Sequence, residues 1–433
     1  MTDNSLRTRL AAERAPVTRE TGPLERRLRR FYDRGVGIRL NELENIQVFG
    51  ETEVGWCPLT LPNETVDDNG RPFVQEKGFS ARDPRTPKRR VYDDPGVCAL
   101  REHLRAHNGI QGLEIVGPHE IERAAQIFFR DGFVVVRDVL NASELERFRA
   151  ASALVLKQIL QIPGAGGRKY LTESYRLPHR YSYGTASASR HLLHDPVWAS
   201  MIDLPTTTPI LTRIFGGPEY NVLGAGGDLC LPGAIEYQAL HSDGDREQFE
   251  MPPARIEQAR RLGIELSGDA TPATQDYRTL QRIIERTPPV VTINFLMTDM
   301  TRENGPIRQI PGSQGRPGHP PSPAHEPEWM RLSTLVGAPA GAAIFRDTRA
   351  WHGGTPNLSR EIRAMPNIEY MAPWYQDPNF RPAMPYEIWA ALSPHAQRIS
   401  LLTRHPPGVW PAGAGVMHPL ASERVAARRP NNG

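Results

Sequence analysis

The spacing of apolar residues first changes clearly from a helical to a strand-like pattern between Glu120 and Arg137. Glu120–Arg130 carries apolar residues at helical spacing, and a glycine then interrupts it. Phe133–Arg137 follows as a short β-branched run, which is typical of a buried strand. Asn141 and Ser143 each offer an N-cap for a further helix over Glu144–Leu160. The pattern predicts a helix, a strand and a second helix, with the helices packed on a sheet.

After Gly217 the pattern becomes predominantly β, and glycine and proline turns separate short apolar runs. Short strands with frequent turns favour an antiparallel sandwich or barrel. The strands that we expect are Tyr220–Gly224, Ala234–Leu240, Val290–Thr298, Ile307–Ile310, Gly341–Phe345 and Ala364–Met371. A charged segment over residues 246–288 interrupts them, and its spacing predicts two helices, Ala254–Leu262 and Tyr277–Glu285.

The flanks of this region have a different character. Residues 1–115 read as a partly ordered N-terminal extension, a lid or an oligomer contact, with helical patterns at Leu24–Tyr32 and Val97–His107. Residues 376–433 form a Pro-rich C-terminal extension. We therefore expect one main domain over residues 116–375. The sequence leaves open whether the protein forms a homo-oligomer.

Composition narrows the class of protein. The hydrophobic share of 39% and the charged share of 23% are ordinary for a soluble globular protein. A net charge of +3 is too small to indicate a nucleic-acid partner. No apolar run approaches the roughly 20 residues that span a bilayer, and no secretory signal pattern opens the chain. The three cysteines, Cys57, Cys98 and Cys230, form no C-x-x-C pair. We expect a cytoplasmic protein with reduced thiols.

One set of residues has the pattern of a metal site. His241 and Asp243 lie two positions apart, so they share a face if the preceding strand continues through them. His352 follows at a long distance, after Trp351. Two histidines and one carboxylate form the facial set that holds iron(II) and leaves positions open. A short His-x-Asp alone is a weak signal, because Asp243 could instead cap a turn.

An arginine strengthens this interpretation. Arg363 follows His352 at a spacing of eleven residues, at the start of the next predicted strand. In an antiparallel hairpin that offset would bring the guanidinium beside the metal. Its fork geometry suits bidentate pairing with a carboxylate. Arg360 is the alternative, but it falls in a polar turn.

Four stretches of the chain together resemble the phytanoyl-CoA dioxygenase family of iron(II)/2-oxoglutarate oxygenases. They are Phe129–Leu140, the His241/Asp243 pair, Asp299–Ser313 with its Asn-Gly turn and Pro-Gly-Ser segment, and His352 through Arg363. The resemblance implies a mainly β fold with flanking helices, built on a double-stranded β-helix (jelly-roll, cupin-like) core.

The resemblance also implies roles for individual residues. His241, Asp243 and His352 would be the catalytic iron ligands, and Arg363 would bind the distal carboxylate of 2-oxoglutarate. Asn294 would face this cosubstrate. The implied reaction is the hydroxylation of an unactivated C–H bond of a small molecule, with O2 and 2-oxoglutarate consumed and succinate and CO2 released. A carboxylate at Asp243 argues against halogenation.

The chain departs from the family pattern at several positions. Ser242 stands where the family often has glutamine, and Gln314 where it often has histidine. Gly354 stands where relatives can have a hydroxyl, so Thr355 is the substitute that we expect to contact the cosubstrate. These departures affect the prediction of the substrate more than the prediction of the iron ligands.

The substrate is the least constrained part of the prediction. The segment before the core is rich in aromatic residues and arginines, which places Arg180, Tyr181 and Tyr183 as candidate substrate contacts. By family analogy the substrate would be a specialised metabolite or a lipid-like molecule. Two alternatives remain: a non-catalytic jelly-roll module with a structural metal, and a cupin-type dioxygenase or isomerase that does not use 2-oxoglutarate.

Overall fold

The computed structural model describes residues 91–160, 180–187, 191–244, 250–316, 318–322, 325–377 and 382–407, with Trp56, Phe380 and Val409 as isolated positions. The predicted helix at Leu24–Tyr32, Cys57 and most of the N-terminal extension lie outside the described residues. The helix predicted at Val97–His107 is confirmed as α3 (Pro95–His107), which the side chain of Asp94 caps through the Gly96 amide at 2.9 Å.

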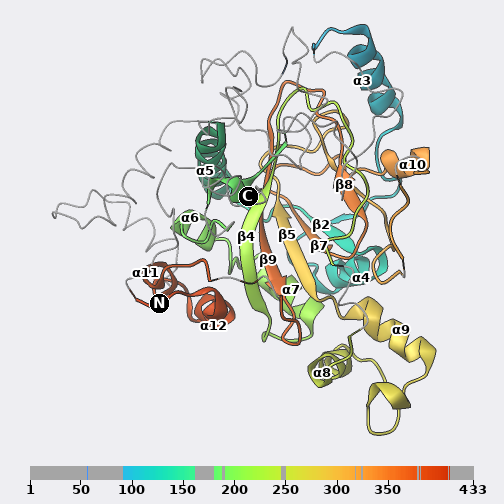
Figure 1. Ribbon diagram of the computed structural model, residues 1–433, viewed down its shortest axis with the longest axis vertical. Helices are drawn as coiled ribbons and strands as arrows, with labels where there is room; N and C mark the ends of the chain where they lie inside the picture. Colours follow the sequence, from blue (N-terminus) through green and yellow to red (C-terminus); the bar gives the residue numbers. More distant parts are fainter. Residues whose placement is uncertain are drawn as a thin grey trace, which may run out of the picture.

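A large mixed sheet forms the centre of the molecule (Figure 1). Its seven strands run in the order β1-β2-β7-β5-β9-β4-β3, and every neighbouring pair is antiparallel except β1 and β2. The strands are β1 (Ile115–Val116), β2 (Phe133–Val136), β7 (Ala343–Asp347), β5 (Val290–Phe295), β9 (Arg363–Met371), β4 (Asn221–Cys230) and β3 (Arg180–Ser182). Only β1 with β2 and β3 with β4 are consecutive strands, and the other neighbours are distant in sequence, so this order could not be read from the strand pattern.

A second, smaller sheet pairs β6 (Ile307–Gln309) with β8 (His352–Gly354) in antiparallel register. Single bridges extend it, from Ala234 to Asn357 and from His241 to His352. The predicted strand Ala234–Leu240 is therefore wrong as a continuous element. Its backbone pairs only at intervals, for example from the Gln238 amide to the Gly354 carbonyl at 2.9 Å.

Helices cover the large sheet, and their local sequence explains where they begin and end. In α4 (Ile121–Asp131) an apolar face packs on β2, and Gly132 ends the helix with a φ of 83°. In α5 (Ala142–Leu160) Asn141 and Glu144 cap each other's backbone amides at 3.0 Å, a capping box that confirms Asn141 rather than Ser143 as the N-cap. Next to these helices, α6 (Pro196–Ala199) packs on α5, and α7 (Thr208–Phe215) packs on α4.

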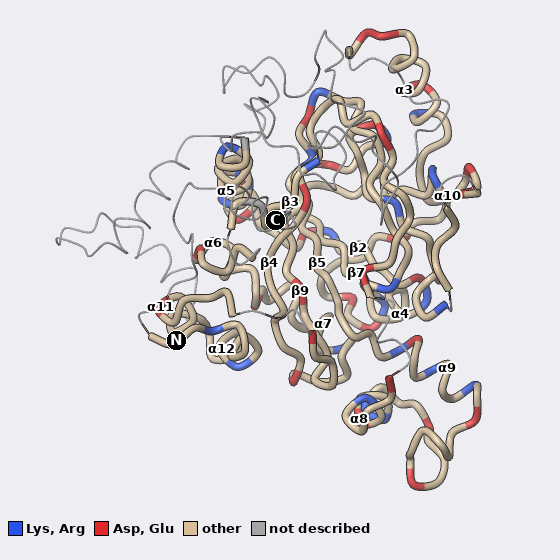
Figure 2. The backbone as a smooth tube through the Cα atoms, viewed as in Figure 1, with Lys and Arg blue, Asp and Glu red and all other residues tan. Residues whose placement is uncertain are grey.

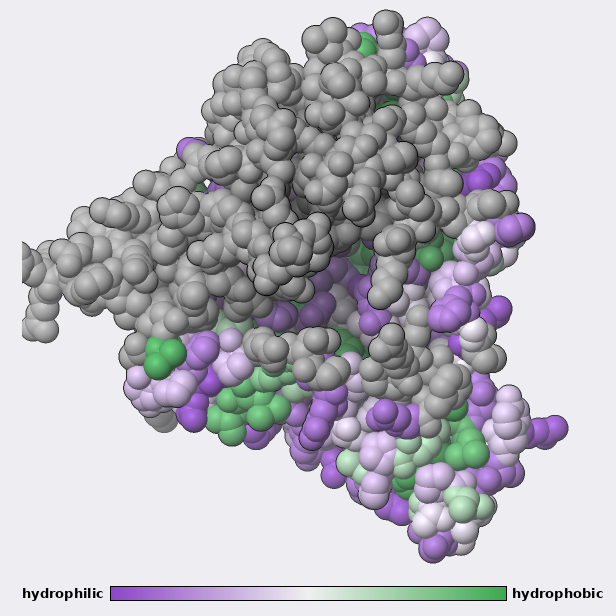
Figure 3. All heavy atoms as spheres, in the orientation of Figure 1, coloured by the Kyte–Doolittle hydropathy of each residue, from purple (hydrophilic) through white to green (hydrophobic). Residues whose placement is uncertain are grey.

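The predicted helical insert projects away from the body of the molecule (Figure 1). It contains α8 (Pro253–Arg261) and α9 (Tyr277–Arg286), and it encloses a small apolar cluster of its own around Ile256 and Ile283. Acidic and basic residues alternate along it in Figure 2, and hydrophilic residues are prominent on its surface in Figure 3. Buried Arg255 ties it to the core by lying over the Trp374 ring at 4.5 Å.

Part of the predicted C-terminal extension joins the main core. Met384, Ile388 and Ile399, from the region of α11 (Tyr386–Trp389) and α12 (Pro394–Ile399), belong to the same apolar cluster as β4, β5 and β9. Asp203 fixes α12 by accepting from Ser393 and His395. No helix in the described part of the chain has the length and apolar character that a bilayer crossing requires.

Candidate metal and cosubstrate site

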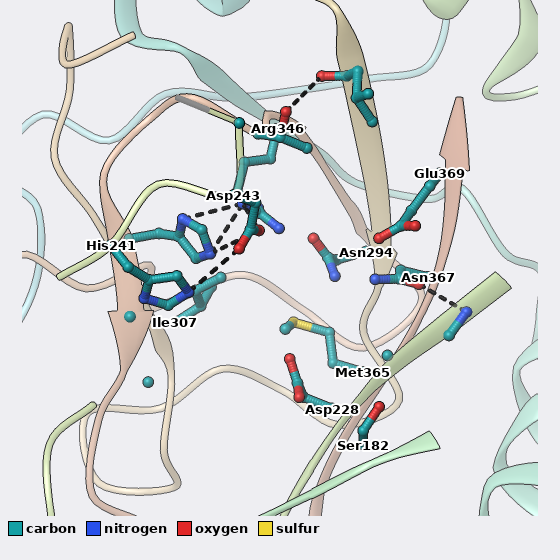
Figure 4. Close-up of a pocket in the computed structure, with 18 of the residues that line it drawn as sticks. Ser182, Asp228, His241, Asp243, Asn294, Ile307, Arg346, Met365, Asn367 and Glu369 are labelled. Carbon is teal, nitrogen blue, oxygen red and sulfur yellow. Dashed lines mark hydrogen bonds and ion pairs between the residues drawn. The ribbon is translucent and has the colours of Figure 1, made fainter. Parts of the chain in front are cut away.

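A cavity of about 370 Å³ lies between the two sheets. Its walls are strongly polar, and they include residues of β4, β5, β7 and β9 on one side and of β8 and the preceding bridged segment on the other (Figure 4). Most of the residues that the sequence singled out meet here. The lining includes His241, Asp243, Asn294, His352, Arg363 and Arg180.

Three of these side chains converge on one point. His241 Nε2 lies 3.5 Å from Asp243 Oδ1, and His352 Nε2 lies 3.2 Å from Asp243 Oδ2. One ligand atom from each residue falls within 4.8 Å of the others. The backbones of His241 and His352 also pair directly, with both N–H···O distances at 3.0 Å. Two imidazoles and a carboxylate in this arrangement fit a divalent transition-metal ion with open coordination positions.

Backbone carbonyls orient both imidazole rings. His241 Nδ1 lies 3.0 Å from the carbonyl of Ala239, and His352 Nδ1 lies 3.0 Å from the carbonyl of Ala350. A proton on Nδ1 satisfies each carbonyl and leaves the Nε2 lone pair facing Asp243, as in most metal-ligating histidines. Burial, with the Arg346 cation beside it, lowers the pKa of His352 to about 4, so this ring is neutral at pH 7.

Sequence reasoning missed Arg346, the other charged group at this point. It extends from β7 and donates from Nη1 to Asp243 Oδ2 at 3.1 Å. Burial opposes ionisation of Asp243, but the neighbouring His352 and Arg346 hold the pKa of this carboxyl well below its usual range. The available signal was an arginine directly after the apolar run Ala343–Phe345.

Two further arginines lie together in the cavity wall. Arg180 on β3 and Arg363 on β9 are both registered with Cys230 of the intervening strand β4. Their side chains are buried, with 6% and 3% exposed. Arg363 donates to the backbone carbonyls of Gly305 at 3.0 Å and Asp228 at 3.1 Å. Neither guanidinium has a carboxylate partner within the described residues.

Arg363 reaches the cavity by a different route from the predicted one. His352 and Arg363 do not form a hairpin, because β8 pairs with β6 and β9 pairs with β5 and β4. The two sheets face each other across the cavity instead. The segment between His352 and Arg363 connects the small sheet to the large one.

Alternate residues of β9 face the cavity. Arg363, Met365, Asn367 and Glu369 all line it, as the two-residue period of a strand requires. Asn294 on β5 is registered with Asn367 and is 2% exposed, and its Oδ1 has no hydrogen-bond partner within the described residues. Figure 4 shows Asn294 between the metal ligands and Glu369. Burial, with Asp243 nearby, raises the pKa of Glu369 to about 7.

Residues 128–365 match the family model of phytanoyl-CoA dioxygenase (PhyH), which is more than half of the 433 residues. The chain belongs to the phytanoyl-CoA dioxygenase family. No curated protein sequence matches it.

Three solved structures are similar to this member of the family. One is the epimerase SnoN in complex with Fe3+, alpha ketoglutarate and nogalamycin RO, at 18% identity over 59% of this chain and 84% of that chain, with a TM-score of 0.39. The carbocyclase SnoK from nogalamycin biosynthesis has 20% identity over 60% and 87%, with a TM-score of 0.38. HygX from Streptomyces hygroscopicus, with nickel, 2-oxoglutarate and hygromycin B bound, has 16% identity over 60% and 94%, with a TM-score of 0.37.

In this phytanoyl-CoA dioxygenase family member, Gly354 makes room for Arg180. A Cβ added at Gly354 would lie 2.5 Å from Arg180 Nη1. The guanidinium therefore occupies the space that a side chain at position 354 would need. Thr355 does not replace that side chain, because it does not line the cavity and its hydroxyl donates to the Pro306 carbonyl at 2.5 Å. The sequence-based role of Thr355 has no support in this placement.

The two tyrosines expected at the substrate site lie in the hydrophobic core. Tyr181 and Tyr183 are 1% and 0% exposed, and neither lines the cavity. Tyr183 instead donates to Ser152 Oγ at 2.8 Å. The reason is strand alternation in β3, which turns Arg180 and Ser182 toward the cavity and Tyr181 toward the core.

Proposed function

We propose that this protein is an iron(II)- and 2-oxoglutarate-dependent oxygenase that hydroxylates a C–H bond of a small molecule. The observation that carries the proposal is the meeting of His241, Asp243 and His352 in a cavity that also contains Arg363. A metal triad alone is common to many activities. A triad that shares its cavity with a buried arginine, for which the described residues provide no carboxylate partner, supports a metal used together with an anionic cosubstrate.

The three ligands would hold iron through His241 Nε2, His352 Nε2 and one oxygen of Asp243. Bound iron(II) supplies the oxidising chemistry with O2, in which 2-oxoglutarate becomes succinate and CO2. The protein contributes ligation, orientation and exclusion of water. Arg346 orients Asp243 through its hydrogen bond, and the Ala239 and Ala350 carbonyls fix the two rings.

Arg363 and Arg180 would hold the distal carboxylate of 2-oxoglutarate. Burying two guanidinium groups without an anion is costly, since each loses its hydration shell. Backbone carbonyls satisfy part of this demand, but Arg180 Nε is buried without a hydrogen-bond partner within the described residues. A carboxylate between the two arginines would supply both the missing acceptor and the missing charge. The unpartnered Asn294 amide would border the same ligand.

The proposal includes the architecture. The large sheet facing the β6–β8 sheet fits a double-stranded β-helix core, with residues 116–375 as the oxygenase domain and the segment 246–288 as its insert. The packing of Met384, Ile388 and Ile399 against the main cluster favours adding α11 and α12 to this domain. The role of the N-terminal extension, as a lid or as an oligomer contact, stays a prediction.

Succinate release with iron(II), ascorbate and 2-oxoglutarate tests the proposed function. Turnover without substrate is expected to be slow but measurable in the wild-type protein, and Asp243→Ala should abolish it together with iron binding. Glu265→Ala, an exposed position on the insert, is the matched control. Iron binding without any response to 2-oxoglutarate would favour a structural metal module. Oxygen consumption that is independent of 2-oxoglutarate would favour a cupin-type dioxygenase, and either result would overturn the proposal.

A further inference from the structure

Among the described residues, the carboxyl group of Glu369 lines the cavity without a partner. Glu369 lines the cavity from β9, and no hydrogen bond or ion pair involves its side chain within the described residues. Its neighbour across the sheet, Thr292, also has a buried hydroxyl for which the described part of the chain provides no hydrogen-bond partner. In Figure 4 the Glu369 carboxyl points toward the space beside Asn294, across from Asp243 and His241.

Asparagine amides surround this carboxyl. Asn294 is buried, and its Oδ1 is unpartnered. Asn367 accepts from the Gly226 amide at 2.9 Å through Oδ1, which leaves its NH2 group for a ligand. A buried polar group without a partner costs free energy, so two asparagines and a carboxyl around one space indicate a polar occupant.

Among the charged side chains that line the cavity, Glu369 is the carboxylate that needs a cation from a bound ligand. Asp243 has Arg346 as its cationic neighbour at 3.1 Å and belongs to the metal site, and Arg346 acts on Glu369 only through space, with no hydrogen bond or ion pair to it within the described residues. Arg180 and Arg363 lie around Cys230, whereas Glu369 is six residues farther along β9 from Arg363, roughly 20 Å of extended strand. The arginines that would bind the cosubstrate therefore do not neutralise Glu369.

We propose that Glu369 binds the ammonium group of the substrate, which would be a hydroxylated amine, with Asn367 hydrogen bonding to its hydroxyl groups. The inference rests on the proposed oxygenase function, because it takes this part of the cavity to be the substrate site. It replaces the lipid-like alternative, since an alkyl chain packed on Glu369 and the two asparagines would desolvate them without giving them partners.

Binding measurements on the full-length protein test this inference. The protein is loaded with nickel(II) and 2-oxoglutarate at pH 7.4, where the Glu369 carboxyl is mostly ionised and the glucosamine amine is mostly protonated, and titrated with glucosamine, N-acetylglucosamine and palmitoyl-CoA. Glucosamine should bind at least about tenfold more tightly than its acetylated form, because a charge-assisted hydrogen bond is replaced by a neutral contact. Glu369→Gln should remove this preference, and Glu361→Gln, an exposed control near the start of the same strand, should keep it.

The possible outcomes distinguish a failure of the Glu369 inference from a failure of the proposed oxygenase function. Equal binding of the two sugars by the wild-type protein, no binding of glucosamine, or tighter binding of palmitoyl-CoA overturns the inference while 2-oxoglutarate binding supports the oxygenase. An undiminished preference in a folded Glu369→Gln variant overturns it as well, with the melting temperature and nickel content as checks of folding. Failure of the wild-type protein to bind 2-oxoglutarate overturns the proposed function itself.

Discussion

Arg346 reaches from the large sheet to Asp243 on the opposite wall of the cavity, with Nη1 and Oδ2 3.1 Å apart. The same nitrogen lies 3.0 Å from His352 Nε2. A single guanidinium therefore contacts two of the three candidate metal ligands. It joins the segment that carries Asp243 to β7, which is a strand in the middle of the core.

Replacing Arg346 should weaken metal binding. Arg346→Met keeps an unbranched chain but removes the donor that orients Asp243, and loss of such an outer contact typically costs 10–100-fold in metal affinity. Equilibrium dialysis with iron(II) or nickel(II) measures the effect, and Arg346→Gln should retain part of the affinity because it keeps a donor. If Arg346→Met bound metal as tightly as the wild-type protein, the backbone alone would be positioning Asp243.

Both arginines that flank Cys230 should contribute to 2-oxoglutarate affinity. We expect Arg363→Met and Arg180→Met each to raise the dissociation constant by a factor of ten or more, since each removes one side of a buried charge pair. Calorimetry on the nickel-loaded protein gives the constants. 2-Oxobutanoate, which lacks the distal carboxylate, is the matched ligand control and should bind all three proteins alike. A loss for Arg363→Met alone would assign Arg180 to another ligand.

The ion pair under the small sheet should be important for stability. Arg308 on β6 and Glu326 are paired with side-chain exposures of 0% and 1%. Glu326→Ala would leave the Arg308 charge buried without its partner, at a cost of about 3–5 kcal/mol in the free energy of unfolding. Urea denaturation measures this, and Glu328→Ala, which removes only partly exposed ion pairs, should stay within about 1 kcal/mol. If both variants lowered the free energy of unfolding equally, the buried Arg308–Glu326 pair would not have the importance for stability that we expect.

Stability should depend on pH through His194. Burial lowers the pKa of His194 to about 4 from 6.5. Between these values the unfolded chain binds a proton that the folded protein excludes, so stability is complete above pH 6.5 and falls as the pH drops toward 4. The loss is on the order of 3 kcal/mol at most. Denaturation at several pH values should show a shallower decline for His194→Gln than for the wild-type protein. Parallel curves would mean that His194 is protonated in the folded state.

Within the described residues, local sequence was enough to predict the helices of nine residues or more and most of the strands. The helical spacing at Glu120–Arg130 and the Asn141 cap predicted α4 and the start of α5, because these features depend on neighbours a few residues apart. The short strands β3 and β8 were not predicted, since three residues are too few to show a period. The spacing of His241 and Asp243 and the position of His352 predicted the three residues that the structure brings together.

The tertiary structure alone decided which residues share the cavity. The sequence determined that Arg363, Met365, Asn367 and Glu369 lie on one face of a strand, but a period of two does not say which face is buried against which sheet. Arg346 and Arg180 reach the site because distant strands pair beside β5 and β4, and Tyr181 leaves it through the same alternation. Strand order depends on long-range packing free energy, whereas spacing and capping are local, so the ligands could be predicted and their partners could not.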